Sequence, residues 1–234
     1  LAAAFGGSSI WRIQHIKQIE AFAFSMLCLW LLSRALERKS ILYGVLAGLA
    51  AGIMVIEPGQ IALLACYVLA GYTIYYWLSA PRFWLSVKQT LAPLLAGGMI
   101  ATVLAAGPIV LTFLFVETSN RPEIAFAEAG RGSLHPASLL TAVVPYLYGI
   151  HSILPYWGPG STDWNADWLS MTENMSQIYI GALPILLLLV AGFLRGGIFA
   201  RDIRFFTITV IGLFLFALGR YTEFFTLAYD YFPG

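Results

Sequence analysis

Charged side chains are what this sequence has least of. Only 11% of its 234 residues are Asp, Glu, Lys or Arg, whereas about a quarter is usual in a soluble domain. The 13 Lys and Arg nearly balance the 12 acids, and they form no basic run of the kind that marks a nucleic-acid-binding surface. The composition therefore argues against an ordinary soluble domain and predicts no nucleic-acid partner.

Cysteine is also scarce. The two cysteines, Cys28 and Cys66, each lie inside an apolar run, where a thiol behaves as a small hydrophobic side chain. They predict no disulfide framework. His135 and His151 stand beside turn residues without a second ligand at metal-binding spacing, so no zinc site is indicated. We identify no cofactor, and a divalent metal is an alternative that the sequence does not support.

Apolar residues, in contrast, make up 59% of the chain. A helix needs about 20 mainly apolar residues to cross the roughly 30 Å hydrocarbon core of a membrane. The sequence therefore predicts an all-α protein, a polytopic bundle of about six transmembrane helices that forms a single domain over residues 1–234. The predicted crossings lie at about 12–33, 41–56, 61–78, 91–116, 178–194 and 205–219.

The short connections predict the orientation of the chain, because Lys and Arg concentrate in cytoplasmic loops. Connections 34–40, 79–90 and 195–204 carry eight of the 13 Lys and Arg and fall on one side of the membrane if all six crossings are present. We predict that this side is cytoplasmic. The long connection 117–177 then lies outside, and we expect a short helix in it with Pro136 in the first turn.

The second and third crossings are separated only by the sequence EPGQ. Because Pro58 and Gly59 do not fit a helix interior, we expect a tight helical hairpin at one membrane surface. The alternative is a helix pair that turns back inside the membrane beside a cavity. Glycine recurs every fourth residue before this point and predicts a thin helix face that a neighbouring helix can approach closely, at Gly44, Gly48 and Gly52.

The stretch WRIQHIKQIE, residues 11–20, is polar although the first crossing must include part of it. Only 12 apolar or small residues follow, from Ala21 to Leu32, which is about 18 Å of helix. At 100° per residue, uncharged hydrogen-bonding side chains share one helix face opposite the isoleucines. This face predicts a binding cavity open to the outer surface, and the alternative is an interfacial helix that lies flat. Its members are Trp11, Gln14, His15 and Gln18.

Glu57 and Gln60 should lie on the same outer side, at the end of the hairpin. Together with the face just described, they form the predicted substrate-binding set, which offers an imidazole, amides and a carboxylate to sugar hydroxyls or a lipid phosphate. The alternative is that Glu57 is an ordinary hairpin residue among the headgroups. No catalytic residue is identified.

The outer connection is rich in aromatic side chains, which can stack on sugar rings but more often form an aromatic belt at the membrane surface. The aromatic residues are Tyr146, Tyr148, Tyr156, Trp157, Trp164 and Trp168. Three acids, Asp163, Asp167 and Glu173, can serve as an acid, a base or metal ligands, although their spacing favours solvated loop acids.

Three stretches together resemble a known family. They are GGSSIWRIQHIKQIEAFAF leading to LLSRALERKS, then AGLAAGIMVIEPGQIALLACYVL, and finally ENMSQIYIGALPILLLL with FALGRYTEFFTLAYDYFPG. In order and spacing they resemble the middle part of the YfhO-like bacterial integral membrane proteins, which are similar to the GT-C glycosyltransferases. His15 and Gln18 match the polar segment before the apolar run, and Gln60 matches the polar residue that opens the following helix. Glu57 and Gly59 depart from the family pattern.

The resemblance implies transfer of a sugar from a polyprenyl-phosphate-linked donor to a cell-envelope acceptor, at the outer face of the bacterial cytoplasmic (inner) membrane. Membrane lipids would surround the protein. In such enzymes the catalytic acid usually lies in the first outer loop, which we expect upstream of Leu1. Two other functions stay open, a lipid or solute transporter (flippase) and a noncatalytic membrane scaffold. A transporter should carry ionisable residues near the bilayer midplane.

Overall fold

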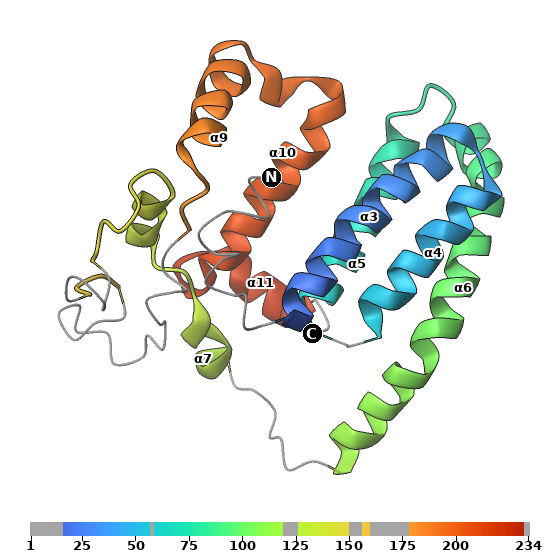
Figure 1. The fold of residues 1–234 in the computed structure, drawn as a ribbon, viewed down its shortest axis with the longest axis horizontal. Helices are drawn as coiled ribbons and strands as arrows, with labels where there is room; N and C mark the ends of the chain where they lie inside the picture. The colour runs from blue at the N-terminus through green and yellow to red at the C-terminus, as the bar shows by residue number, and fades with distance from the viewer. Residues whose placement is uncertain (1–15, 57–58, 119–125, 150–155, 160–177, 232–234) are drawn as a thin grey trace. The chain divides into compact units, whose positions relative to one another are not determined.

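A computed structural model describes residues 16–56, 59–118, 126–149, 156–159 and 178–231. These residues form helices and irregular connections, so the predicted all-helical class is confirmed for them (Figure 1). The contacts divide the chain into two compact units. We call them the four-helix unit, described over residues 16–118, and the C-terminal unit, described from residue 126 to residue 231.

The four-helix unit consists of α3 (Ile16–Arg38), α4 (Ile41–Val55), α5 (Gln60–Leu78) and α6 (Phe83–Thr118). Helix α4 lies between α3 and α6, and α5 packs against α3 (Figure 1). Three segments are long and apolar enough to cross a membrane, Gln18–Arg38, Gln60–Leu78 and Phe83–Phe115. These three correspond to the first, third and fourth predicted crossings.

Two predicted connections of this unit are largely helical. Helix α3 continues through most of 34–40 and ends at Arg38, because Ala35 and Leu36 are fully buried and hold the last turn in the core. Helix α6 begins at Phe83, so the predicted connection 79–90 shortens to four residues. The charged residues follow the apolar runs in the sequence, but Arg34 and Lys88 lie inside α3 and α6. Their long side chains can extend from a helix into the headgroup layer.

The packing of α4 and α5 differs from a closely paired hairpin. Helix α5 makes its main contacts with α3, and α4 makes its main contacts with α6 and α3. The chain reverses direction between the two helices, and Gly59 at the start of α5 has an extended backbone. Pro58 and Glu57 lie outside the described residues.

Helices α4 and α6 approach each other along the predicted glycine face. A Cβ atom added to Gly44 would overlap the backbone of Pro93, and one added to Gly48 would overlap the backbone of Gly97. Further along, Gly52 meets the side chain of Leu104. The prediction of a thin face is confirmed, because the missing side chains let the two backbones touch.

The C-terminal unit contains shorter helical segments. They are α7 (Phe126–Ala129), η1 (Gly130–Gly132), η2 (Pro136–Ala142), α9 (Ala182–Leu187), the π-helical η4 (Leu188–Leu194), η5 (Gly197–Phe199), α10 (Arg201–Ala217), η6 (Gly219–Tyr221) and α11 (Glu223–Tyr231). The short helix expected at Pro136 is η2, a 3-10 helix with Pro136 in its first turn.

The remaining three predicted crossings are apolar helices of lesser length, Ile41–Val55, Ala182–Leu194 and Ile203–Ala217. The predicted crossing 178–194 is helical only from Ala182, since Gly181 has a φ of 101° and interrupts the helix geometry. Each of these helices has fewer residues than the about 20 that a straight crossing needs. The chain therefore has three helices of membrane-spanning length and three shorter apolar ones among its described residues.

Candidate functional site

Two of the six predicted substrate-binding residues are described. Gln18 lies in the first turn of α3 and is partly buried, and Gln60 is the first residue of α5 and is exposed. Trp11, Gln14, His15 and Glu57 lie outside the described residues.

Gln18 and Gln60 lie at the same end of the four-helix unit. There the start of α3, the end of α4 and the start of α5 meet around an apolar cluster of Ala21, Met54 and Ala62. The cluster is buried. The two glutamines therefore flank an apolar core.

A second polar group lies in the C-terminal unit, where the segment before η2 meets the turn between α10 and α11. The Ser133 hydroxyl donates to the Gly130 carbonyl at 2.6 Å and accepts the backbone N–H of Arg220 at 3.1 Å. The backbone N–H of Leu134 donates to the Ala217 carbonyl at 2.7 Å. These three hydrogen bonds hold the two segments together.

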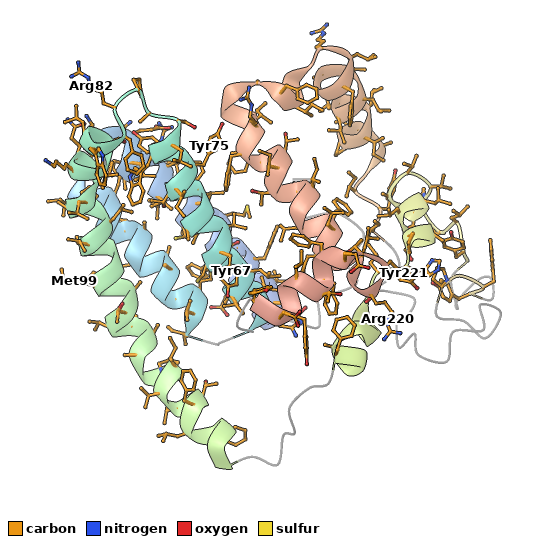
Figure 2. All side chains as sticks on the ribbon, turned by 180° about the vertical axis from the view of Figure 1, so that it is seen from behind. Tyr67, Tyr75, Arg82, Met99, Arg220 and Tyr221 are labelled. Carbon is orange, nitrogen blue, oxygen red and sulfur yellow. The ribbon has the colours of Figure 1, made fainter. Side chains whose placement is uncertain are left out.

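Two glycines shape this contact. Gly219 has a φ of 54°, in the left-handed region, and a Cβ atom there would overlap the Ser133 side chain. Gly130 lies against the Arg220 guanidinium, since an added Cβ atom would be 3.0 Å from Arg220 Nε. The backbone thus brings the guanidinium, the Ser133 hydroxyl and the turn into one compact group. Figure 2 shows Arg220 and Tyr221 at this turn.

His135 and Tyr221 complete the group, which we call the Arg220 cluster: Ser133, His135, Arg220 and Tyr221. The two rings pack edge to face, with centroids 5.1 Å apart. His135 Nδ1 accepts the backbone N–H of Ala137 at 3.1 Å, so the proton of the neutral ring lies on Nε2.

Burial shifts the pKa values of these two side chains. It lowers the pKa of His135, and it raises the pKa of Tyr221, an effect that the nearby Arg220 charge partly opposes. At neutral pH the cluster therefore combines one cation with neutral groups that carry N–H and O–H donors. A guanidinium favours phosphate or carboxylate oxygens, so Arg220 is the candidate anion ligand of this cluster.

Ser133, Arg220 and Tyr221 were not predicted from the sequence. Ser133 and Arg220 are 87 positions apart, and no periodicity within a helix relates residues at that distance. The one local signal was a Gly-Arg-Tyr sequence directly after an apolar run. It did not indicate a site, because an Arg at the end of a membrane crossing commonly contacts lipid headgroups.

The predicted aromatic set divides into buried and exposed members. Tyr148 and Tyr156 are buried, and their hydroxyls donate to the carbonyls of Ala137 and Pro159, so they support the loop instead of forming a surface belt or a sugar platform. Tyr146 and Trp157 stay 55% and 48% exposed. Trp164, Trp168, Asp163, Asp167 and Glu173 lie outside the described residues.

Around η2, further hydroxyls are buried. Thr141 Oγ1 donates to the Ser138 carbonyl at 2.6 Å and accepts the backbone N–H of Ile178 at 3.1 Å, which joins η2 to the segment before α9. Within the described ranges, no three His, Cys, Asp or Glu side chains come together as metal ligands would.

Comparisons of the chain with protein-family models, with curated proteins and with solved structures gave no match. The resemblance to the YfhO-like proteins stays a prediction from the sequence.

Proposed function

We propose that this chain is part of a membrane glycosyltransferase that resembles the GT-C enzymes. It would transfer a sugar from a polyprenyl-phosphate-linked donor to a cell-envelope acceptor at the outer face of the bacterial cytoplasmic membrane. The proposal draws on the YfhO-like resemblance and on three helices of membrane-spanning length. The catalytic acid is not assigned.

The observation that carries the proposal is the Arg220 cluster next to an apolar helix. A guanidinium favours phosphate oxygens, and Arg220 lies beside the Ser133 hydroxyl and the His135–Tyr221 ring pair. Helix α10, which ends one turn before Arg220, exposes apolar side chains at Ile208 and Ile211. A donor with a phosphate head and a hydrocarbon tail would use both features at once.

We also propose that the predicted substrate-binding set binds sugar hydroxyls. Gln18 and Gln60 share one end of the four-helix unit, and amide side chains both donate to and accept from sugar hydroxyls. Trp11, Gln14, His15 and Glu57 belong to the same predicted set and lie outside the described residues.

An ion-coupled transporter is the less favoured alternative. The interiors of 61–78, 91–116, 178–194 and 205–219 contain no Asp, Glu, Lys, Arg or His. Transporters usually place ionisable groups at that depth, because coupling ions and protons need a charged or titratable ligand. A noncatalytic scaffold makes no such demand, and only an activity assay separates it from an enzyme.

The test is sugar transfer in membranes that contain the full-length protein, with a panel of polyprenyl-phosphate-linked sugars. We expect Arg220→Gln to lower transfer at least tenfold, because it removes the cation while leaving the backbone bond to Ser133. Arg204→Gln is the matched control, since Arg204 is an exposed arginine of the same unit that bonds the Phe199 carbonyl. Protein abundance is measured for each variant.

Two results would contradict the proposal at different levels. If the wild-type protein transfers no sugar from any donor, the enzyme assignment fails, and the transporter or the scaffold becomes the better explanation. If the wild type is active and Arg220→Gln is as active as Arg204→Gln, the protein is an enzyme whose donor phosphate binds elsewhere.

A further inference from the structure

Basic side chains gather at the end of the four-helix unit opposite to Gln18 and Gln60. Residues 16–118 contain six Lys and Arg, and all but Lys17 lie near the end of α3 or the start of α6. These five are Arg34, Arg38, Lys39, Arg82 and Lys88.

Two hydrogen bonds show that the connections carrying these residues lie together. The Tyr76 hydroxyl, near the end of α5, donates to the Leu36 carbonyl of α3 at 3.1 Å. The indole N–H of Trp77 donates to Thr90 Oγ1 of α6 at 3.0 Å. The end of α5 is thus tied to both α3 and α6, and Figure 2 shows Arg82 at this end.

Little negative charge opposes this group. Arg34 pairs with Glu37 at 3.2 Å. Arg38 donates instead to the Tyr43 hydroxyl at 3.1 Å, and its guanidinium carbon lies 5.3 Å from the centre of that ring. In the described part of the chain, no carboxylate forms an ion pair with Arg38, Lys39, Arg82 or Lys88, all of which are exposed.

Lys39 occupies a backbone position that favours glycine. Its φ is 52°, in the left-handed region, and the following Ser40 N–H closes the helix end by bonding the Ala35 carbonyl at 3.2 Å. Glycine adopts this conformation without steric conflict, whereas lysine does not. The chain therefore has a charge where the local structure favours a residue without a side chain, which is typical of a functional position.

Exposed apolar and aromatic side chains border the basic end. Leu78 is 70% exposed and Trp84 is 74% exposed, with Phe83 packed against the Trp84 ring at 5.1 Å between centroids. Tryptophan at the end of a membrane helix lies at the level of the lipid headgroups. The four cations without an ion pair in the described part of the chain, Arg38, Lys39, Arg82 and Lys88, would then lie at the depth of the lipid phosphates.

We propose that this basic end binds the headgroup of an anionic phospholipid. Arg38 and Arg82 would contact the phosphate, because guanidinium groups match phosphate oxygens, and Lys39 would add a point charge. The inference stands apart from the proposed sugar transfer, since it uses residues of the other end of the four-helix unit.

The test is native mass spectrometry of the delipidated full chain in detergent, titrated with dioleoylphosphatidylglycerol and, separately, with dioleoylphosphatidylcholine. We expect tighter binding of phosphatidylglycerol. Because each basic residue near the headgroups strengthens binding about fivefold, Arg38→Gln and Arg82→Gln should each weaken it by about that factor. Arg34→Gln is the matched control and should weaken binding less, because Arg34 already pairs with Glu37.

Lys39→Gly separates binding from folding. The glycine should raise the thermal midpoint of the lipid-free protein, because it relieves the left-handed backbone, while it weakens phosphatidylglycerol binding about fivefold. A residue with a purely structural role would not give opposite signs in the two measurements.

Three results would overturn the proposal. The first is equal affinity for the two lipids. The second is unchanged phosphatidylglycerol affinity in a folded Arg38→Gln/Arg82→Gln variant. The third is competition by inorganic phosphate that abolishes lipid binding at matched concentration, which would assign the site to a soluble anion.

Discussion

Thr90 illustrates at the residue scale how one hydroxyl joins two helices. It is fully buried in α6, donates to the Ser86 carbonyl at 2.9 Å and accepts the indole N–H of Trp77 at 3.0 Å. A threonine inside a helix usually satisfies its own donor in this way, and its free lone pair then serves a neighbouring helix. The contact depends on both residues, because an indole N–H needs an acceptor when it is buried.

We predict that Thr90→Val lowers the free energy of unfolding by about 1–2 kcal/mol, because valine keeps the shape but leaves the Trp77 N–H without its acceptor. Thr112→Val is the control, since exposed Thr112 only bonds the Pro108 carbonyl of its own helix, and its effect should stay below about 0.5 kcal/mol. Denaturant titration in mixed micelles measures both. Equal losses would show that the interhelical bond contributes nothing.

His135 predicts a dependence of stability on pH. Burial lowers its pKa in the folded state below the usual 6.5, so the unfolded chain binds more protons once the pH falls under that value. The stability associated with neutral His135 is therefore fully present above about pH 6.5 and decreases as the pH falls toward the folded pKa.

His135→Asn should remove this dependence, because asparagine can still accept the Ala137 N–H at the start of η2 but does not titrate. Lowering the pH from 7.5 to 5.5 should reduce the thermal midpoint more for the wild type than for the variant. The same fall in both proteins would show that other groups cause the pH dependence.

At the element scale, α4 and α6 pack closely because glycines at their contact have no side chains. Gly44 and Gly48 of α4 lie against Pro93 and Gly97 of α6, so the backbones themselves form the interface. The prolines of α6, Pro93 and Pro108, do not interrupt the helix, which is tolerated where neighbouring helices support the backbone.

Adjacent glycines of α6 provide a matched test. Gly97→Ala should destabilise the protein by about 1–3 kcal/mol, because the new Cβ atom would overlap the Gly44 carbonyl. Gly98→Ala should be neutral or stabilising by up to about 1 kcal/mol, since nothing lies within 4 Å of its Cβ position and alanine favours a helix. Unfolding in mixed micelles compares the two. A similar effect of both substitutions would contradict the close approach of α4 and α6.

At the scale of the whole molecule, α3 to α6 alternate in direction. The predicted orientation of the chain follows from this alternation together with the position of Lys and Arg, and it stays a prediction. The alternation places Ser40 and Ala80 at one end of the four-helix unit and Gln18 and Gly59 at the other.

Labelling of single cysteines tests this arrangement in a background without Cys28 and Cys66. Gln18→Cys and Gly59→Cys should react with an impermeant maleimide added outside intact cells, whereas Ser40→Cys and Ala80→Cys should react only after permeabilisation. Reaction of all four from outside would contradict a transmembrane four-helix unit. Reaction of the second pair alone would reverse the predicted orientation.

The sequence by itself determined the helical class of the described residues and the membrane-type composition. In hydrocarbon each backbone group must be satisfied within its own segment, so long apolar runs predict helices without knowledge of their neighbours. The Gly44, Gly48 and Gly52 face was predictable for a similar reason, because their spacing places them on one side of α4.

Only the tertiary structure decided where helices end, which helices pack together and which distant residues meet. Arg38 stays helical because Ala35 and Leu36 are buried, α5 contacts α3 more than its sequence neighbour α4, and Ser133 bonds the backbone of Arg220. Each of these features depends on contacts between segments far apart in the chain, whose energies no local pattern of residues contains.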